Sequence, residues 1–172
     1  MKTILRRAAM AAAVVVTAGS VVGAPAAYAS SGHGSGHGNG HGDDHHSGRT
    51  ILAAELAGSL TTDPVLFGVA PGGADWVIGH SKATLRHGGR LDVRVDDLVL
   101  TSTGANPVTQ VAASVVCNGM VVATTAVVPF STTGDAKIKA NVTLPKRCIA
   151  PVVLLNPRGN AAVYIAVTGT EG

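Results

Sequence analysis

The chain contains 172 residues, with 13 Lys and Arg against 10 Asp and Glu, and carries a formal net charge of +3 at pH 7. Three of the cations, Lys2, Arg6 and Arg7, precede an apolar N-terminal run, and the rest of the chain has as many basic as acidic side chains. This balance argues against a nucleic-acid or anionic-membrane partner, and two cysteines are too few for a disulfide scaffold or a four-cysteine zinc site.

Residues 1–29 have the features of a signal peptide. A cationic start is followed by an apolar stretch over about residues 8–22, and residues 27–29 form the small-x-small pattern that signal peptidase accepts. About fifteen residues of mostly Ala and Val are short and weakly apolar for crossing ~30 Å of hydrocarbon. We therefore expect cleavage before Ser30 and release of a secreted, extracellular protein with no stable membrane anchor.

Residues 30–48 consist mainly of Gly, His and Ser and contain no aliphatic side chain to bury. This composition predicts a disordered, low-complexity N-terminal arm. Its histidines are candidate ligands of Zn²⁺, Ni²⁺ or Cu²⁺, because only chain entropy opposes their meeting on one ion. The competing interpretation is a solvated spacer, and both remain open. The candidate metal ligands are His33, His37, His41, His45 and His46.

Residues 49–172 are expected to form one compact domain. Valine, threonine, alanine and glycine dominate this part of the sequence, and turn signals recur at short intervals. These features favour an all-β fold, a single antiparallel β-sandwich of immunoglobulin-like architecture. Residues 51–60 are predicted as its first strand despite their alanines. The immunoglobulin Cys-Trp-Cys pattern itself is absent, because Trp76 precedes both cysteines.

Residues 81–98 alternate between apolar and polar side chains around a Gly88-Gly89 turn. Strand pairing must bring like faces together, which excludes a two-residue loop and favours a three-residue one. Residues 87–89 would use the conformational freedom of glycine, whereas residues 88–90 would place Arg86 opposite Asp92. Both registers remain open.

Asn118-Gly119 is a strong hairpin signal between strands expected over residues 108–117 and 120–128. A two-residue turn there pairs Cys117 with Met120 and Val115 with Val122. Both faces of this hairpin are apolar or small, so we expect it to be covered on both sides.

The C-terminal part of the domain contains three further predicted strands. Residues 136–144 alternate, with Ile138 and Val142 among the inward side chains. Residues 149–155 and 161–168 are expected to form a last hairpin around a turn at residues 156–159. Pro151 favours an edge position for that hairpin, because proline cannot donate a ladder hydrogen bond.

Cys117 and Cys148 are the only cysteines, and both belong to the exported part of the chain. An intramolecular disulfide is therefore expected. Closing a loop of about 32 residues stabilises a fold by roughly 3–4 kcal/mol on the chain-entropy estimate.

The sequence contains no nucleophile elbow, zinc-protease helix, phosphate loop or EF-hand, so we expect no enzymatic activity. Sugar or nucleic-acid ligands would require exposed aromatic rings. Phe67 and Phe130 are expected to fill the core, which leaves Trp76 and Tyr164 as candidate ligand contacts. Core packing of Trp76 is the competing interpretation.

Four segments carry a resemblance to known proteins: residues 66–78, 102–108, 112–117 and 128–136. They resemble small secreted β-rich proteins of actinobacteria, a likeness that implies no particular activity. Residues 54–59, 83–85 and 91–93 carry a fainter similarity, to the chordin-type repeat, although the histidine pair of such repeats is missing here.

These observations together predict a secreted, non-catalytic protein that acts as an extracellular interaction or structural module toward an unidentified extracellular partner. The alternative is an extracellular transition-metal-binding protein in which the histidine-rich arm holds the ion. Deleting the arm separates the two hypotheses, since only the second loses its function with it.

Overall fold

The computed structural model describes residues 48–169, and the structural statements below concern that range. The predicted signal peptide and the arm through residue 47 lie outside it. The described residues form strands, turns and loops without a helix, so the all-β prediction is confirmed. Within the same range there is accordingly no helix long and apolar enough to cross a membrane.

One antiparallel sheet has four strands in the order β1-β5-β6-β11. Its apolar side chains face inward and its polar ones outward, as the alternation predicted. The strands are β1 (Thr50–Ala54), β5 (Ser81–Arg86), β6 (Arg90–Val95) and β11 (Ala136–Asn141).

The turn between β5 and β6 settles the two registers that the sequence left open. Leu85 lies opposite Leu91, so the loop comprises residues 87–89, and Gly89 has a φ of +86°. The alternative with Arg86 opposite Asp92 is wrong, since Thr84 takes that place. The reason is burial: Leu85 and Leu91 are both fully buried and must share one face.

The larger sheet has the order β10-β8-β12-β14-β2. Strand β9 also pairs with β8, on the same edge as β10 but farther along the strand. All of its pairings are antiparallel. Its strands are β2 (Leu56–Gly58), β8 (Gln110–Cys117), β9 (Met120–Thr124), β10 (Val128–Pro129), β12 (Val152–Pro157) and β14 (Ala166–Thr168). Short pairs complete the fold: β3 (Ala70–Pro71) with β13 (Val163–Tyr164), and β4 (Trp76–Val77) with β7 (Val99–Leu100).

The Asn118-Gly119 hairpin is confirmed between β8 and β9, with Cys117 opposite Met120. The register then shifts at a β-bulge, so Val115 faces Ala123 and the predicted pairing with Val122 is wrong. Strand β8 is buried on both faces, as expected. Strand β9 is not covered on both sides, since Met120 is 66% and Val121 36% exposed.

The antiparallel pairing of the last two segments is confirmed, because β12 pairs with β14 and Leu155 lies opposite Ala166. The continuous strand predicted over residues 161–168 is wrong, since β13 pairs with β3 and only β14 joins β12. The edge position inferred from Pro151 is wrong, because β12 lies between β8 and β14. Proline is tolerated there since Pro151 precedes the first ladder residue, Val152, and so removes no donor from the sheet.

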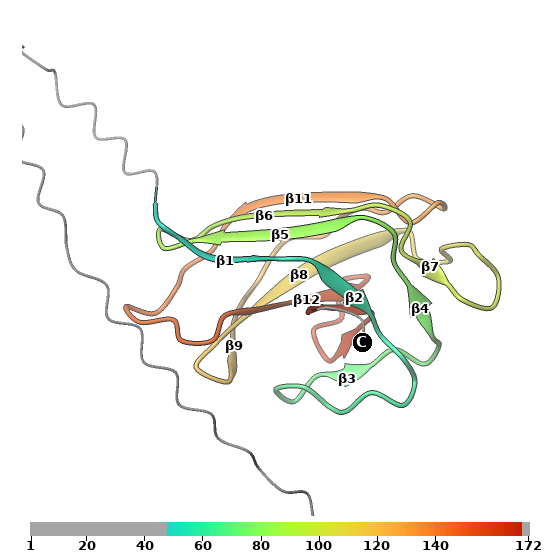
Figure 1. Cartoon of the computed structure of the whole chain (residues 1–172), viewed down its shortest axis with the longest axis horizontal. Coiled ribbons are helices and arrows are strands. Elements are labelled where there is room, and N and C mark those ends of the chain that lie inside the picture. The colour runs from blue at the N-terminus through green and yellow to red at the C-terminus, as the bar shows by residue number, and fades with distance from the viewer. Residues whose placement is uncertain (1–47, 170–172) are drawn as a thin grey trace, which may run out of the picture. The chain divides into compact units, whose positions relative to one another are not determined.

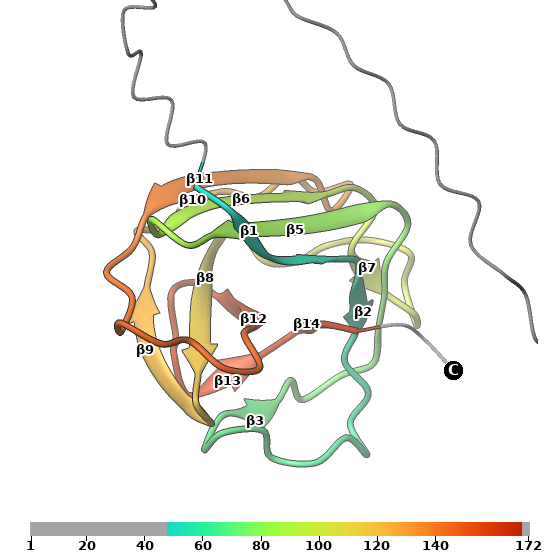
Figure 2. The ribbon, with the colours of Figure 1, turned by 60° about the vertical axis from the view of Figure 1, so that its left-hand side comes forward.

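The two sheets lie one above the other, with β1, β5, β6 and β11 forming the upper layer in Figures 1 and 2. A single hydrophobic cluster joins them, and it contains Leu85 and Ile138 from the first sheet with Val115 and Leu155 from the second. The chain passes from one sheet to the other at Glu55, between β1 and β2.

A second, smaller cluster lies on the outer face of the larger sheet. Val116 and Leu154 contact Val69 and Tyr164 there, so the segment that contains β3 covers strands that would otherwise face solvent. This extra layer explains why β8 and β12 are apolar on both faces.

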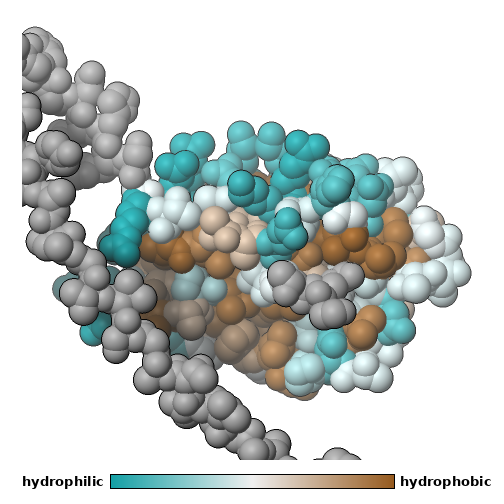
Figure 3. Space-filling view, in the orientation of Figure 1, coloured by the Kyte–Doolittle hydropathy of each residue, from teal (hydrophilic) through white to brown (hydrophobic). Residues whose placement is uncertain are grey.

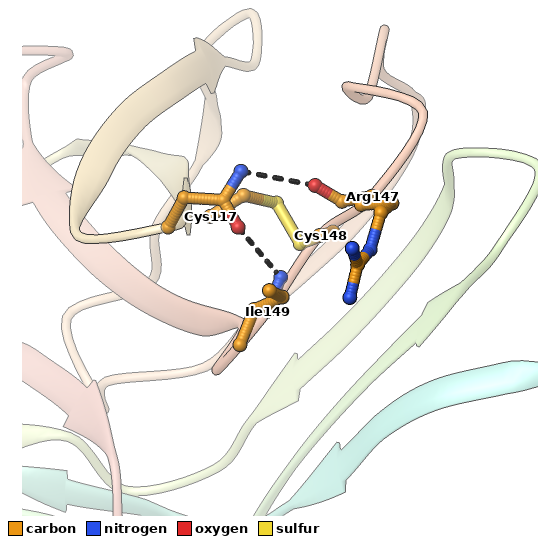
Figure 4. Close-up of a disulfide and its surroundings, with 5 residues drawn as sticks. Cys117, Arg147, Cys148 and Ile149 are labelled. Atoms are coloured by element: carbon orange, nitrogen blue, oxygen red, sulfur yellow. Dashed lines mark hydrogen bonds between the residues drawn. A yellow bond between two sulfur atoms is a disulfide. The ribbon is translucent and has the colours of Figure 1, made fainter.

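The predicted disulfide joins Cys117, at the end of β8, to Cys148, with 4.8 Å between the two Cα atoms. Asn118 reinforces the link (Figure 4): its side chain donates to the Arg147 carbonyl at 2.9 Å and accepts from the Ile149 amide at 2.9 Å. The bridge therefore fixes the Asn118-Gly119 turn to the segment that leads into β12.

Candidate functional site

A cavity of about 580 Å³ lies beneath the segment of residues 59–77. We call it the Trp76 cavity. This volume is within the range of small-molecule sites, which is roughly 300–1,000 Å³. The side chains that matter for its chemistry are Leu60, Asp63, Leu66, Trp76, Tyr164 and Val167.

Hydrogen bonds at the middle of the segment and between its two ends hold it over the cavity. The Tyr164 hydroxyl donates to the Pro64 carbonyl at 2.9 Å, which ties the middle of the segment to β13. Near its end, the Asp75 carboxylate accepts from the Thr61 amide at 2.7 Å and from the Thr61 hydroxyl at 2.9 Å. These bonds hold the pKa of Asp75 below its ordinary value, because they favour the charged form.

Trp76, the sole tryptophan of the chain, forms one wall of the cavity. It starts β4, and its amide donates to the Ser59 carbonyl at 2.8 Å. Gly58 is needed beside it, because a Cβ at that position would collide with the Trp76 carbonyl. Only 5% of the Trp76 surface is exposed, so the ring is largely packed in the core, as the competing interpretation had it.

Tyr164 belongs to β13 and is fully buried, yet it also lines the cavity. Burial raises the pKa of its phenol, and the negative charge of Asp63 adds to the effect. The structure thus brings the two predicted contact residues to one site. They are walls of a cavity and not the exposed stacking platforms that a sugar site requires.

Asp63 gives the cavity its only carboxylate. One of its oxygens accepts from the Leu60 amide at 2.9 Å, and this bond closes the turn in which Asp63 lies. The neighbouring walls are aliphatic or aromatic, with the Thr101 side chain as a further polar group. The cavity therefore combines an apolar interior with one anionic group.

Phe67 was expected in the core, and that expectation is wrong. It is 40% exposed and has a φ of +52°, followed by Gly68 at +81°. Leu66 and Val69 exchange both backbone hydrogen bonds around this two-residue turn. The turn places the ring outside, in a conformation that costs an aromatic residue free energy. Phe130, by contrast, is buried as expected.

Exposed apolar side chains gather in the segment that covers the cavity. Besides Phe67, the side chains of Leu60, Val65 and Val77 are each more than 40% exposed. In Figure 3, hydrophobic residues lie below a hydrophilic upper edge, where the four-stranded sheet is found. Sequence reasoning missed this rim, because alternation within a loop does not indicate which side chains are buried.

The two histidines of the domain and the two carboxylates of β6 and its end lie away from the cavity. His80 and His87 are exposed, and Asp92 and Asp96 pair with arginines two residues away on the same strand or its end. Within residues 48–169 no group of three His, Cys, Asp or Glu side chains is arranged to hold a metal ion. The five histidines of the arm lie outside the described residues, and their metal-binding role stays a prediction.

Comparison with known proteins gives no relative for this chain. No protein-family model matches it, and neither a curated protein nor a solved structure shows significant similarity to it.

Proposed function

We propose that the protein is an exported, non-catalytic binding module whose immunoglobulin-like sandwich holds a small ligand in the Trp76 cavity. One observation carries the proposal: a cavity of about 580 Å³ with apolar and aromatic walls contains one carboxylate. Such a combination of apolar lining and few polar groups is typical of small-molecule sites. The disulfide is compatible with an extracellular location.

The lining specifies the class of ligand. Leu60, Leu66 and Val167 suit an aliphatic or aromatic body, and Asp63 suits a cationic group that donates hydrogen bonds. The Tyr164 hydroxyl already donates its hydrogen to the Pro64 carbonyl, so it does not serve as a donor to an acidic ligand. We therefore propose a small apolar amine as the ligand class.

Trp76 supplies the readout, because its emission is the only tryptophan signal of the chain. The mature protein is titrated with 2-phenylethylamine and with the neutral analogue 2-phenylethanol. We expect a saturable change in emission with both, and tighter binding of the amine by about tenfold, since a charged hydrogen bond contributes roughly 1.5–3 kcal/mol.

Asp63→Asn retains the acceptor for Leu60 and removes the charge, so it is expected to abolish the preference for the amine while the alcohol still binds. Asp92→Asn, on the outer face of β6, is the matched control and should keep the preference. An unchanged preference in Asp63→Asn, or no change in Trp76 emission with either compound, would refute the proposal.

A second candidate function is metal capture by the arm, supported by the regular spacing of its five histidines. Calorimetric titration of Ni²⁺ into the chain of residues 30–172 and into that of residues 49–172 tests it. Binding that disappears with the arm supports metal capture, and binding that is equal in both contradicts it.

A further inference from the structure

The outer face of the four-stranded sheet gathers most of the domain's positive charge. Six of the ten Lys and Arg residues in positions 49–172 point outward from β5, β6 and β11, accompanied by two carboxylates, Asp92 and Asp96. We call this surface the cationic face. It carries a net charge of +4, whereas residues 49–172 together carry +2, so the rest of the domain is acidic. The six cations are Lys82, Arg86, Arg90, Arg94, Lys137 and Lys139.

The register places like charges directly opposite one another. Lys82 lies opposite Arg94, and Arg94 lies opposite Lys137, which makes a row of three cations across three strands. Neighbouring strands are about 4.8 Å apart, and like charges at that distance destabilise a sheet. Folding alone therefore does not account for this row.

The carboxylates of the face compensate the row only in part. Asp96 accepts from Arg94 at 2.9 Å, and Asp92 accepts from Arg90 at 3.3 Å. Within residues 48–169, Lys82 and Lys137 form no ion pair, and both side chains are exposed. Among the described residues, Lys82 and Lys137 thus lie without an ion-pair partner on the two sides of Arg94, whose charge Asp96 neutralises.

The surface between these cations is hollowed. One shallow cavity of about 150 Å³ is bordered by three cations, Lys82, Arg94 and Lys137, and by one carboxylate, Asp92. Another of about 420 Å³ continues past Arg94 and Lys137, where Asp96 and Asp135 balance their charge. No aromatic side chain borders either hollow. In the smaller hollow an anion can therefore approach three cations at once, whereas a nucleobase would find no ring to stack on.

We propose that the cationic face binds a linear polymer of polyol phosphate, in which phosphodiesters are joined by small polyols. Residues two apart on one strand, such as Lys137 and Lys139, are separated by about 6.6 Å, so successive phosphates can meet successive cations. Arginine adds planar donors that suit phosphate oxygens. This surface lies on the opposite layer from the Trp76 cavity and does not depend on the function proposed for it.

The test measures binding of poly(glycerol phosphate) to the mature chain at low and at physiological salt. The double variant Lys82→Glu/Lys137→Glu is compared with Lys146→Glu/Arg147→Glu, which changes the net charge equally on the segment between β11 and the disulfide. We expect at least about tenfold weaker binding and a shallower salt dependence for the first variant, and about wild-type binding for the second.

Equal losses in both double variants would show that net charge alone drives binding and would overturn the proposal. The proposal would also be overturned if a single-stranded DNA of equal charge bound as tightly as the polyol phosphate. Circular dichroism establishes folding before binding is measured. If the glutamate variant does not fold, Lys82→Gln/Lys137→Gln replaces it, with the same expected loss of affinity relative to Lys146→Gln/Arg147→Gln.

Discussion

Tyr164 combines three roles at the scale of a single residue. It fills the smaller hydrophobic cluster, lines the Trp76 cavity and, through its hydroxyl, holds the covering segment at Pro64. Ionisation would place a buried phenolate beside Asp63 and would remove the hydrogen that bonds to Pro64. The hydrogen bond that holds the segment at Pro64 therefore requires protonated Tyr164.

The titration of Tyr164 follows from these contacts. Because its pKa is raised above the ordinary value of 10.0, its contribution to stability is complete below pH 10 and is lost as the pH rises through the folded-state pKa. In a chain that begins at Ser30 and therefore lacks Tyr28, tyrosinate absorbance reports Tyr164 alone. We expect ionisation above pH 10 that coincides with unfolding; ionisation at the ordinary value in a folded protein would contradict the burial.

Phe67 tests the cost of backbone strain. Phe67→Asn replaces an aromatic residue with φ of +52° by one that adopts this conformation readily, so we expect the free energy of unfolding to rise by about 1 kcal/mol. Val65→Asn, on the same segment and 63% exposed, is the control and should change stability by less than about 0.5 kcal/mol. Urea denaturation measures both. A loss of stability in Phe67→Asn would show that packing of the ring outweighs strain.

At the scale of the element, the four-stranded sheet contains both a repulsive and an attractive pair of facing charges. Lys82 faces Arg94, a repulsive pair, whereas Lys139 faces Asp92, an attractive one. The same substitution, lysine to glutamate, is therefore expected to have opposite effects at the two positions.

Lys82→Glu should raise the free energy of unfolding and Lys139→Glu should lower it, each by roughly 0.2–1 kcal/mol because both side chains are exposed. The difference should shrink when salt is added. Denaturation curves at low and high ionic strength measure it. Effects of the same sign at both positions would contradict the register of β5, β6 and β11.

The individual elements show where sequence reasoning succeeds. The alternation in β5, β6 and β11 and the Asn118-Gly119 turn are local signals, and both were correct. The bulge opposite Val115 and the central position of β12 depend on partners far along the chain, so Pro151 and a simple turn rule were misleading. The exposure of Phe67 was not predicted because Phe-Gly is an uncommon dipeptide in a two-residue turn.

At the scale of the whole molecule, the disulfide connects the end of the larger sheet to the chain that leaves β11. Replacing both cysteines by alanine is expected to lower the free energy of unfolding by roughly 3–4 kcal/mol, the loop-closure contribution of the bridge. Guanidinium denaturation of the variant and of the oxidised wild type measures the difference. Equal stabilities would show that Asn118 alone suffices to fix this junction.

The distribution of charge also becomes visible only at this scale. Counting residues gave a balanced mature chain and argued against polyanionic partners, yet register and alternation collect six cations on one face. The Trp76 cavity was equally inaccessible to sequence reasoning, which selected Trp76 and Tyr164 by their chemistry but had no means of placing them together. Both surfaces arise from long-range pairing.

Chemical-shift mapping by NMR tests the central claim, that the Trp76 cavity is a ligand site, most directly. Isotopically labelled mature protein is titrated with 2-phenylethylamine, and the perturbed amides are located on the structure. The account predicts saturable shifts at Asp63, Leu66 and Trp76, including the indole signal, with the outer face of β6 and β11 unchanged. Shifts confined to other surfaces, or none up to the solubility limit of the amine, would contradict it.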